Sequence, residues 1–366
     1  MKKNPIFYLF FIFLICISLL DIASEKKSFS ALENRNLSKK PKFSLKSFME
    51  GEYIKDYEEY INDNFLFRDE WISLKALSEE FLGKKENNNI IYGKEGYMFE
   101  KTLSYKEDRF KNNIDSVSKF IDSYNGRVTT VMVPNSYTIY KEYLPFGLEL
   151  LDQEKLIDAV YEGSKRDLNI DLVKLFKENK KDYIYYKTDH HWTTYGAYLG
   201  YSSYMSLLGE KEISLKDLKE NKMDNFYGTY FSKSKKIFSK GDFLTYYDIN
   251  NISMNIYGEE FDSLYDYEKL EERDKYSFFL RGNNGLTLIK NNNIKEDKKL
   301  LIFKDSFANS MIPFLAMHFK EIHVIDLRSF KLKVSDYIKD KNFQEVLILY
   351  NIENFFNDIN ILKIKY

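Results

Sequence analysis

The chain has 366 residues, of which 44% are hydrophobic, and its 55 basic and 56 acidic side chains leave a net charge of -1. This length and apolar content predict a folded protein of two or three structural units and exclude a chain that is disordered throughout. The balanced charge offers no basic excess for a phosphate backbone, so nucleic acid is not an expected partner. Cys16 is the one cysteine of the sequence, which excludes an internal disulfide framework and a cysteine-based metal site.

An almost wholly apolar, uncharged run from Ile6 to Leu20 follows Lys2 and Lys3. With the next few residues it approaches the roughly 20 that a helix needs to cross a bilayer. Lysines before such a run favour a cytoplasmic amino terminus and an exported body. The sequence LLDIAS matches a signal-peptidase site poorly. We therefore expect residues 1–24 to be an uncleaved, single-pass anchor in the cell membrane. The alternatives are a cleaved signal, which would give a secreted protein, and a buried core helix.

Residues 25–90 are predicted to be a linker followed by a helical arm. The first part, 25–45, is polar, whereas apolar residues recur at helical spacing over 48–82. We expect two helices there, with a break near the sequence NDNF. A hairpin is predicted next, over 87–100, because two strand-like runs flank a glycine-containing turn.

Residues 91–366 are predicted to be an α/β domain. The strand-like runs RVTTVMVP, LLIF, EIHVIDL and EVLILY alternate with helical segments. This alternation indicates a parallel sheet flanked by helices on both faces. Residues 210–285 are polar and irregular, and we interpret them as an inserted cap.

The densest polar cluster of the sequence is KTDHHWT, which precedes a predicted helix. Asp189 and His191 are two residues apart, and such residues point the same way in an extended or turn segment. A carboxylate beside an imidazole fixes its tautomer and stabilises the imidazolium that forms during proton transfer. One alternative is an N-cap for the helix, and another is a metal site formed with His190. Because no HExxH-type partner motif occurs, we expect no metal.

A second polar element, Lys304-Asp305-Ser306, follows the strand-like run LLIF and precedes an apolar helix. Catalytic groups gather at the carboxyl ends of parallel strands, and a helix N-terminus there helps to stabilise an oxyanion. By itself, Asp-Ser before a helix is an ordinary cap. Together with the first cluster, Ser306 becomes a candidate nucleophile, with His191 as its base and Asp189 as the group that orients the base. The sequence contains no GxSxG elbow, which disfavours the α/β-hydrolase arrangement.

The blocks TDHHWT and KDSFANSMIPFLAMHF are specific, and weaker blocks such as YGAY, DNFLFRDEW, VPNSYTIY, FYGTYFSKS and FFLRGNNGL accompany them. In this order they resemble the DHHW family over about residues 33–349. That family is similar to the SGNH-hydrolase-like domains of alginate O-acetylation proteins. The resemblance implies an SGNH-hydrolase-like fold in circularly permuted order. It also implies that Asp189 and His191 are the acid–base pair and that Ser306 is the nucleophile.

The resemblance further implies the reaction and the partners. We expect an extracytoplasmic O-acetyltransferase that acts on a cell-surface or secreted polysaccharide through an acetyl-Ser intermediate, without a cofactor. Because acetyl-CoA is cytoplasmic, a membrane-bound O-acyltransferase would have to supply the acetyl group. One alternative is a carbohydrate O-acetylesterase that uses the same three residues. Another is a non-catalytic polysaccharide-binding or assembly subunit.

Three further residues are candidates for contact with the substrate or the oxyanion. Asn283, in the segment RGNNG, would hold the oxyanion together with backbone N–H groups near Ser306, or it belongs to a simple turn. Arg328 lies at a predicted strand end, where substrate binding, capping and ion pairing are all open. Trp192 would stack on a sugar ring, or it is a core residue at the start of the helix.

Overall fold

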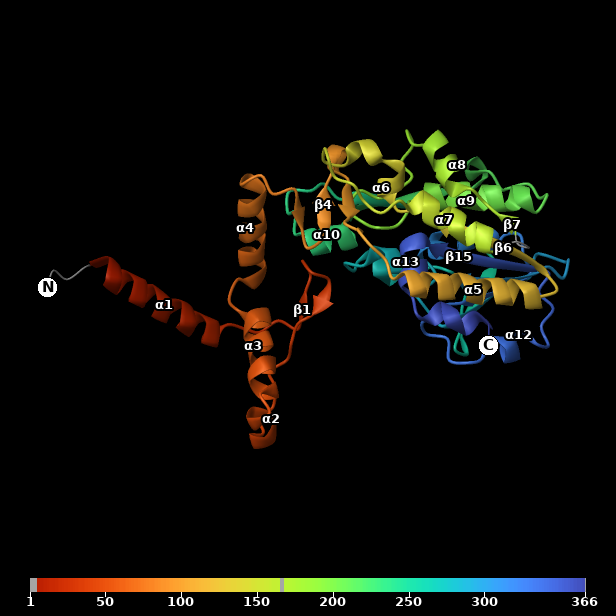
Figure 1. The fold of residues 1–366 in the computed structure, drawn as a ribbon. Helices are drawn as coiled ribbons and strands as arrows, with labels where there is room; N and C mark the ends of the chain where they lie inside the picture. Colours follow the sequence, from red (N-terminus) through yellow and green to blue (C-terminus); the bar gives the residue numbers. More distant parts are fainter. Residues whose placement is uncertain (1–4, 165–167, 366) are drawn as a thin grey trace. The chain divides into compact units, whose positions relative to one another are not determined.

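The computed structural model describes residues 5–164 and 168–365 (Figure 1). The chain divides into two compact units, Met1–Asn88 with Phe231–Phe238, and Asn89–Tyr230 with Ser239–Tyr366. The assignment of 25–90 as an arm and of 91–366 as a catalytic domain remains a prediction.

The first unit is built mainly from helices. Its elements are α1 (Pro5–Ala23), β1 (Phe29–Ser30), β2 (Arg35–Asn36), α2 (Leu45–Met49), α3 (Glu52–Asn64), α4 (Arg68–Phe81) and β3 (Glu86–Asn87). The helix α1, drawn in red in Figure 1, is an apolar helix of 19 residues without a buried side chain. By length and composition it can cross a membrane. The break expected near NDNF separates α3 from α4, and α2 is a third helix that the periodicity did not indicate.

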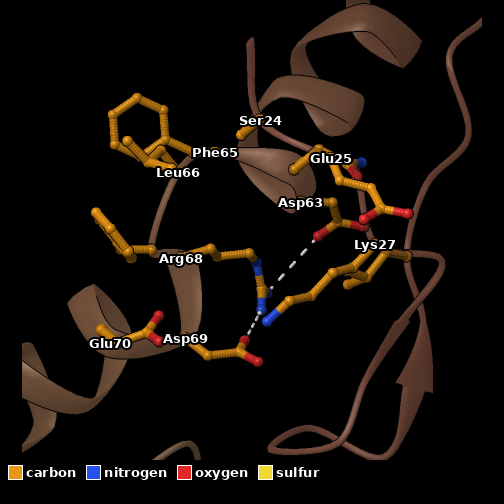
Figure 2. Close-up of a pocket in the computed structure, with 12 residues that line it drawn as sticks. Ser24, Glu25, Lys27, Asp63, Phe65, Leu66, Arg68, Asp69 and Glu70 are labelled. Carbon is orange, nitrogen blue, oxygen red and sulfur yellow. Dashed lines mark hydrogen bonds and ion pairs between the residues drawn. The ribbon is translucent and has the colours of Figure 1, made fainter. Parts of the chain in front are cut away.

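Ion pairs around Arg68 hold the first unit together (Figure 2). The Arg68 guanidinium lies 2.9 Å from Asp69 and 3.6 Å from Asp63, as Figure 2 shows. It also lies 2.5 Å from Glu33. Arg35 donates to both carboxylate oxygens of Asp63, and these hydrogen bonds hold the pKa of Asp63 well below its usual range. Asp63, Arg68 and Asp69 also line a cavity of about 230 Å³.

An eight-stranded mixed sheet in the order β11-β10-β12-β14-β13-β15-β6-β7 forms the centre of the second unit. The strands are β6 (Arg127–Val133), β7 (Leu168–Asn169), β10 (Ile252–Ile256), β11 (Glu259–Phe261), β12 (Leu286–Asn291), β13 (Lys299–Lys304), β14 (Glu321–Ile325) and β15 (Glu345–Asn351). From β14 to β7 neighbouring strands are parallel, whereas β12, β10 and β11 pair antiparallel. The predicted α/β class with a parallel sheet is confirmed, and the antiparallel edge is an addition.

Helices cover both faces of this sheet. They are α5 (Glu107–Ser123), α6 (Ser136–Ile139), α7 (Gln153–Gly163), α8 (Leu172–Glu178), α9 (Thr194–Leu207), α11 (Ile312–Leu315), α12 (Val334–Ile338) and α13 (Ile352–Asn357). The helix α5 packs against α13, and α8 packs against α9. Figure 1 shows these two pairs on opposite sides of the central strands. The central strands are therefore buried on both faces, which explains the continuous apolar runs by which they were predicted.

Smaller elements complete the chain. The expected hairpin contains β4 (Ile90–Tyr92) and β5 (Met98–Glu100). Residues 210–285, interpreted as an inserted cap, contain the antiparallel pair β8 (Glu220–Phe226) and β9 (Asp242–Tyr247), the helix α10 (Thr229–Ser234), and the sheet strands β10 and β11. For the residues outside β10 and β11, the cap interpretation remains a prediction.

Candidate active site

Polar side chains gather at the carboxyl ends of three adjacent parallel strands. Asp305 and Ser306 follow β13, Asn351 ends β15, and Asn135 follows β6. The Asp305 carboxylate accepts a hydrogen bond from the Asn351 backbone N–H at 2.7 Å, and the Asn351 amide donates to Asn135 Oδ1 at 2.6 Å. These bonds tie the three strand ends to one another at the sheet edge where ligands of α/β proteins are expected.

Ser306, His191 and Asp189 form a continuous hydrogen-bonded line at this edge. Ser306 Oγ lies 2.8 Å from His191 Nε2, and His191 Nδ1 lies 2.6 Å from Asp189 Oδ1. Asp189 and His191 are buried, whereas Ser306 is partly exposed. Residues that are 115 positions apart in the sequence therefore meet at hydrogen-bonding distance. The serine hydroxyl is the end of the line that solvent can reach.

The Asp189 carboxylate is held by four donors. Its Oδ1 accepts from the His191 backbone N–H at 3.0 Å as well as from the ring, and its Oδ2 accepts from Thr229 N at 2.8 Å and from Thr229 Oγ1 at 3.1 Å. Burial by itself raises the pKa of Asp189, but the neighbouring His190 and His191 and the hydrogen bonds together lower it well below its usual range. Asp189 is therefore ionised at neutral pH and faces His191 as a carboxylate.

The loop that carries Asp189 and His191 is closed by main-chain bonds. Tyr185 and Trp192 form an antiparallel bridge. The carboxylate of Asp242 accepts from the backbone N–H of both Lys187, at 2.9 Å, and Thr188, at 2.8 Å. These contacts hold the loop in a turn that places the side chains of residues 189 and 191 on the same side.

The N-cap of α9 is Thr193. Its hydroxyl accepts from the Gly196 N–H at 3.2 Å. The sequence left open that Asp189 caps this helix, and the structure excludes that alternative because the capping position is occupied by Thr193. The carboxylate of Asp189 is thus available for His191.

Two aromatic rings contact the imidazole of His191. The Tyr276 ring stacks on it with centroids 3.7 Å apart and planes 7° apart, and the His190 ring centroid also lies 3.7 Å away. Tyr276 is fixed in turn by a hydrogen bond between its hydroxyl and Ser310 Oγ at 3.1 Å. The His191 ring plane is therefore set by packing as well as by hydrogen bonds.

The same cluster meets the geometric requirement for a metal site, because Asp189, His190 and His191 each offer a ligand atom within 4.8 Å of the others. However, both Asp189 oxygens already accept two hydrogen bonds, and His190 Nδ1 lies 2.6 Å from Thr229 Oγ1. A cation would have to displace these bonds, whereas proton transfer uses them as they stand. The donor set therefore fits acid–base chemistry better than metal binding.

Asn283 is held by two polar side chains that flank Ser306 in the sequence. Its Oδ1 accepts from Lys304 Nζ at 2.7 Å and from Asn309 Nδ2 at 3.2 Å. Lys304 is buried and also lies 3.8 Å from Asp326. Burial lowers the pKa of Lys304 to about 8, although the charge of Asp326 acts in the opposite direction. Asn283 itself is exposed, and its carbonyl oxygen is the end that Lys304 and Asn309 hold.

The structure corrects the predicted role of Trp192 and shows an ion pair for Arg328. Trp192 is fully buried, and its indole N–H donates to the Phe307 carbonyl at 2.9 Å. The prediction that Trp192 stacks on a sugar is therefore wrong, and Trp192 is a core residue at the start of the helix. Arg328 donates to both oxygens of Asp326, at 2.9 and 2.6 Å, which is the ion pair that the sequence left open.

Sequence reasoning did not identify Gly228, Thr229 and Tyr276 as site residues. A Cβ atom at Gly228 would lie 2.2 Å from Asp189 Cβ, so this position admits only glycine without movement. Gly228 and Thr229 belong to FYGTYFSKS, one of the weaker blocks of the family resemblance, and this block could have indicated them. Tyr276 is 85 residues from His191, in a segment without a local pattern.

Fold and site together define the chain as an α/β protein with a Ser–His–Asp arrangement at the ends of its parallel strands. The family model described as DHHW protein matches residues 147–325, which include all three of these residues. A crystal structure of a DHHW family protein from Eubacterium siraeum shares 25% identity and a TM-score of 0.66, over 76% of this chain and 96% of that one. The resemblance to the DHHW family is thus confirmed.

Two other solved structures are similar to this chain at lower identity. Bacillus cereus PatB1, in a structure with a sulfonyl adduct, has 24% identity and a TM-score of 0.63, over 76% of this chain and 100% of that one. The O-acetyltransferase domain of Pseudomonas putida AlgJ has 12% identity and a TM-score of 0.48, over 76% and 98%. The search of curated proteins finds no match to this chain.

Proposed function

We propose that this chain is an extracytoplasmic O-acetyltransferase that modifies a cell-surface or secreted polysaccharide through an acetyl-Ser intermediate on Ser306. The observation that carries the proposal is the line from Ser306 Oγ through the His191 ring to Asp189. A serine hydroxyl is a weak nucleophile until a base takes its proton, and a base works best when a third group fixes its tautomer. The three residues meet both requirements.

In the first half of the reaction, His191 Nε2 takes the Ser306 proton while Oγ forms a bond to the acetyl carbonyl carbon. Asp189 stabilises the imidazolium that results. Collapse of the tetrahedral intermediate breaks the bond to the donor oxygen, and His191 returns the proton to that leaving group. In the second half, a sugar hydroxyl gives its proton to His191 and attacks the acetyl-Ser. Ser306 leaves with the proton from His191, and an O-acetyl sugar is released.

In both halves of the reaction, the negative charge that develops on the carbonyl oxygen needs hydrogen-bond donors. We assign one of them to the Asn283 amide, because Lys304 and Asn309 hold its carbonyl end and Asn283 is exposed. Losing one such donor costs roughly 3 kcal/mol of transition-state stabilisation. Arg328 remains a weaker candidate for substrate binding, since Asp326 already occupies its guanidinium.

The location of the domain decides where the acetyl group comes from. We read α1 as an uncleaved anchor that leaves the body of the chain outside the cytoplasm. Acetyl-CoA is cytoplasmic, so the acetyl group has to be passed across the membrane. A membrane-bound O-acyltransferase is the class of partner that would supply it to Ser306.

The proposal is tested with an aryl acetate as acetyl donor and neutral oligosaccharides as acceptors. We expect acetyl release, an acetylated Ser306 peptide by mass spectrometry, and transfer to sugar that exceeds hydrolysis. A sulfonyl fluoride should label Ser306, because such reagents react with activated serine hydroxyls. Ser306→Ala should abolish all of these signals, and His191→Ala should strongly reduce them.

The outcomes separate the candidate functions. Acetyl-Ser with hydrolysis alone would replace the transferase by a carbohydrate O-acetylesterase. If neither acetyl-Ser nor sulfonylation occurs in the folded protein, the chain is a non-catalytic polysaccharide-binding subunit, and the proposal is refuted.

A further inference from the structure

A strongly basic and apolar stretch, residues 39–49 (KKPKFSLKSFM), lies in the first unit. It contains four lysines and no acidic residue, and all four lysines are exposed. Its large apolar side chains are exposed as well: Phe43 is 64% exposed, Leu45 71% and Met49 78%. One lysine, Lys46, has an ion pair, which joins it at 4.0 Å to the exposed Glu50. We call residues 39–49 the basic segment.

The helix α3 continues this surface with an apolar face that other elements leave exposed. Tyr53, Tyr57 and Tyr60 lie on one side of α3 at helical spacing, and Ile54 and Ile61 flank them. Ile54 is 55% exposed and Ile61 44%. The helix α3 also contains five acidic residues, Glu52, Asp56, Glu58, Glu59 and Asp63. On a helical wheel, Glu52, Glu59 and Asp63 lie away from the apolar face, whereas Asp56 borders Tyr60 and Glu58 borders Ile54.

Ring contacts join the basic segment to this face. The Phe43 ring lies 5.2 Å from that of Tyr53, Tyr53 stacks on Tyr57 at 5.7 Å, and Tyr57 lies 6.1 Å from Tyr60. These four rings form one aromatic row along α3 that starts among the lysines. Such a combination of exposed aromatic side chains and lysines is typical of elements that lie in the headgroup region of a bilayer.

Hydrogen bonds hold the start of the basic segment and the end of α1 close to the end of α3. Asp21, in the last turn of α1, accepts a hydrogen bond from the Leu66 N–H at 2.8 Å. Ser38, which directly precedes the basic segment, donates from its N–H to Asp63 at 2.8 Å and accepts from the Asn64 amide at 2.9 Å. The start of the basic segment is thus bonded to the last two residues of α3, and the end of α1 is bonded to the short connection that follows them.

We propose that the basic segment and the apolar face of α3 dock onto an anionic lipid surface beside the point where α1 leaves the membrane. This inference rests on the reading of α1 as an anchor. Each lysine close to an anionic bilayer strengthens attachment roughly fivefold, and the exposed rings enter the interface. Glu52 and Glu59 of α3 then point away from the lipid, while Asp56 and Glu58 lie at the edges of the contact. A second copy of the chain fits this surface less well, because a two-fold interface would place the lysines of both copies against each other.

The test uses the full chain in vesicles. In a Cys16→Ser background, Phe48→Cys carries an environment-sensitive fluorophore, and the vesicles contain spin-labelled lipid as quencher. We expect strong quenching in phosphatidylcholine vesicles that contain phosphatidylglycerol, and weak quenching without it or at high salt. Replacement of Lys39, Lys40, Lys42 and Lys46 by Gln should remove the quenching, and replacement by Arg should retain it. A fluorophore at Phe146→Cys, an exposed position of the second unit, is the matched control and should not be quenched.

Vesicle flotation separates the anchor from the docking surface. If the chain floats with the vesicles but the label at position 48 is not quenched, the docking surface is refuted and the anchor stands. Quenching that is equal in neutral vesicles and unchanged by the Gln variants would also refute it. Self-quenching of the label that rises with protein density, whatever the lipid charge, would identify a second copy as the occupant. A chain that does not float refutes the anchor and, with it, this inference.

Discussion

Asp189→Asn is the substitution that most directly tests the candidate site, because it keeps the shape of the side chain and changes its hydrogen bonds. Each Asp189 oxygen accepts two bonds, on one side from the His191 main chain and ring and on the other from Thr229 N and Oγ1. An amide has one acceptor end and one donor end. Whichever way Asn is placed, its NH₂ group faces a backbone N–H at a distance of about 3 Å in the present geometry.

The two placements have different consequences. If the amide oxygen faces Thr229, the NH₂ group faces His191 Nδ1 and selects the tautomer that carries its proton on Nε2, which cannot accept the Ser306 proton. A tautomer error of this kind lowers kcat by about 10⁴-fold in enzymes with this arrangement, or roughly 5 kcal/mol of barrier. If the amide oxygen faces His191 instead, the Thr229 N–H loses its partner, which costs about 1–3 kcal/mol of folding free energy.

The assay measures kcat for aryl acetate turnover together with the urea unfolding free energy of the same preparation. Asp242→Asn is the matched control, because Asp242 is a buried carboxylate that holds the same loop through Lys187 and Thr188 without contacting His191. We expect the control to lose stability with a much smaller loss of kcat. A folded Asp189→Asn protein that keeps kcat within about tenfold of the parent and also keeps the parent's unfolding free energy would contradict the role assigned to this carboxylate.

Three further predictions follow from neighbouring contacts. Gly228→Ala places a Cβ atom 2.3 Å from Asp189 Oδ2, so we expect a loss of about 1–3 kcal/mol in unfolding free energy and reduced turnover, measured by urea unfolding and acetyl release. Tyr276→Leu removes the ring stacked on His191 and should lower kcat more than it changes KM, while Tyr276→Phe, which keeps the ring, should retain most of kcat. The pKa of Lys304 is lowered to about 8 in the folded chain, so the unfolded chain binds more protons between pH 8 and its ordinary pKa of 10.5. Stability should therefore rise with pH across that window, and Lys304→Met should remove this rise when unfolding free energies are compared between pH 8 and about 10.

The central strands could be predicted because each is buried on both faces and therefore reads as a continuous apolar run, as in β6 and β13. The antiparallel strands β10 and β12 could not, because they alternate buried and more exposed residues within a polar stretch. For the candidate site, too, only residues in a clear local pattern could be predicted. Asp189, His191 and Ser306 belong to dense local motifs, whereas Tyr276 acts through a contact that only the folded chain creates. Trp192 was given a sugar-stacking alternative because its neighbours are polar, but its side chain turns into the core.

The place of β15 in the sheet bears on when the serine becomes reactive. Although β15 is the last strand in the described chain, it lies between β13 and β6, and it is the strand that joins the two. Its end supplies the Asn351 N–H that holds Asp305, the residue before Ser306. If the body of the chain is exported behind α1 from residue 25 onward, β15 reaches the outside after every other part of the site. Under the proposed function, we therefore expect Ser306 to become reactive only when nearly the whole chain has been exported.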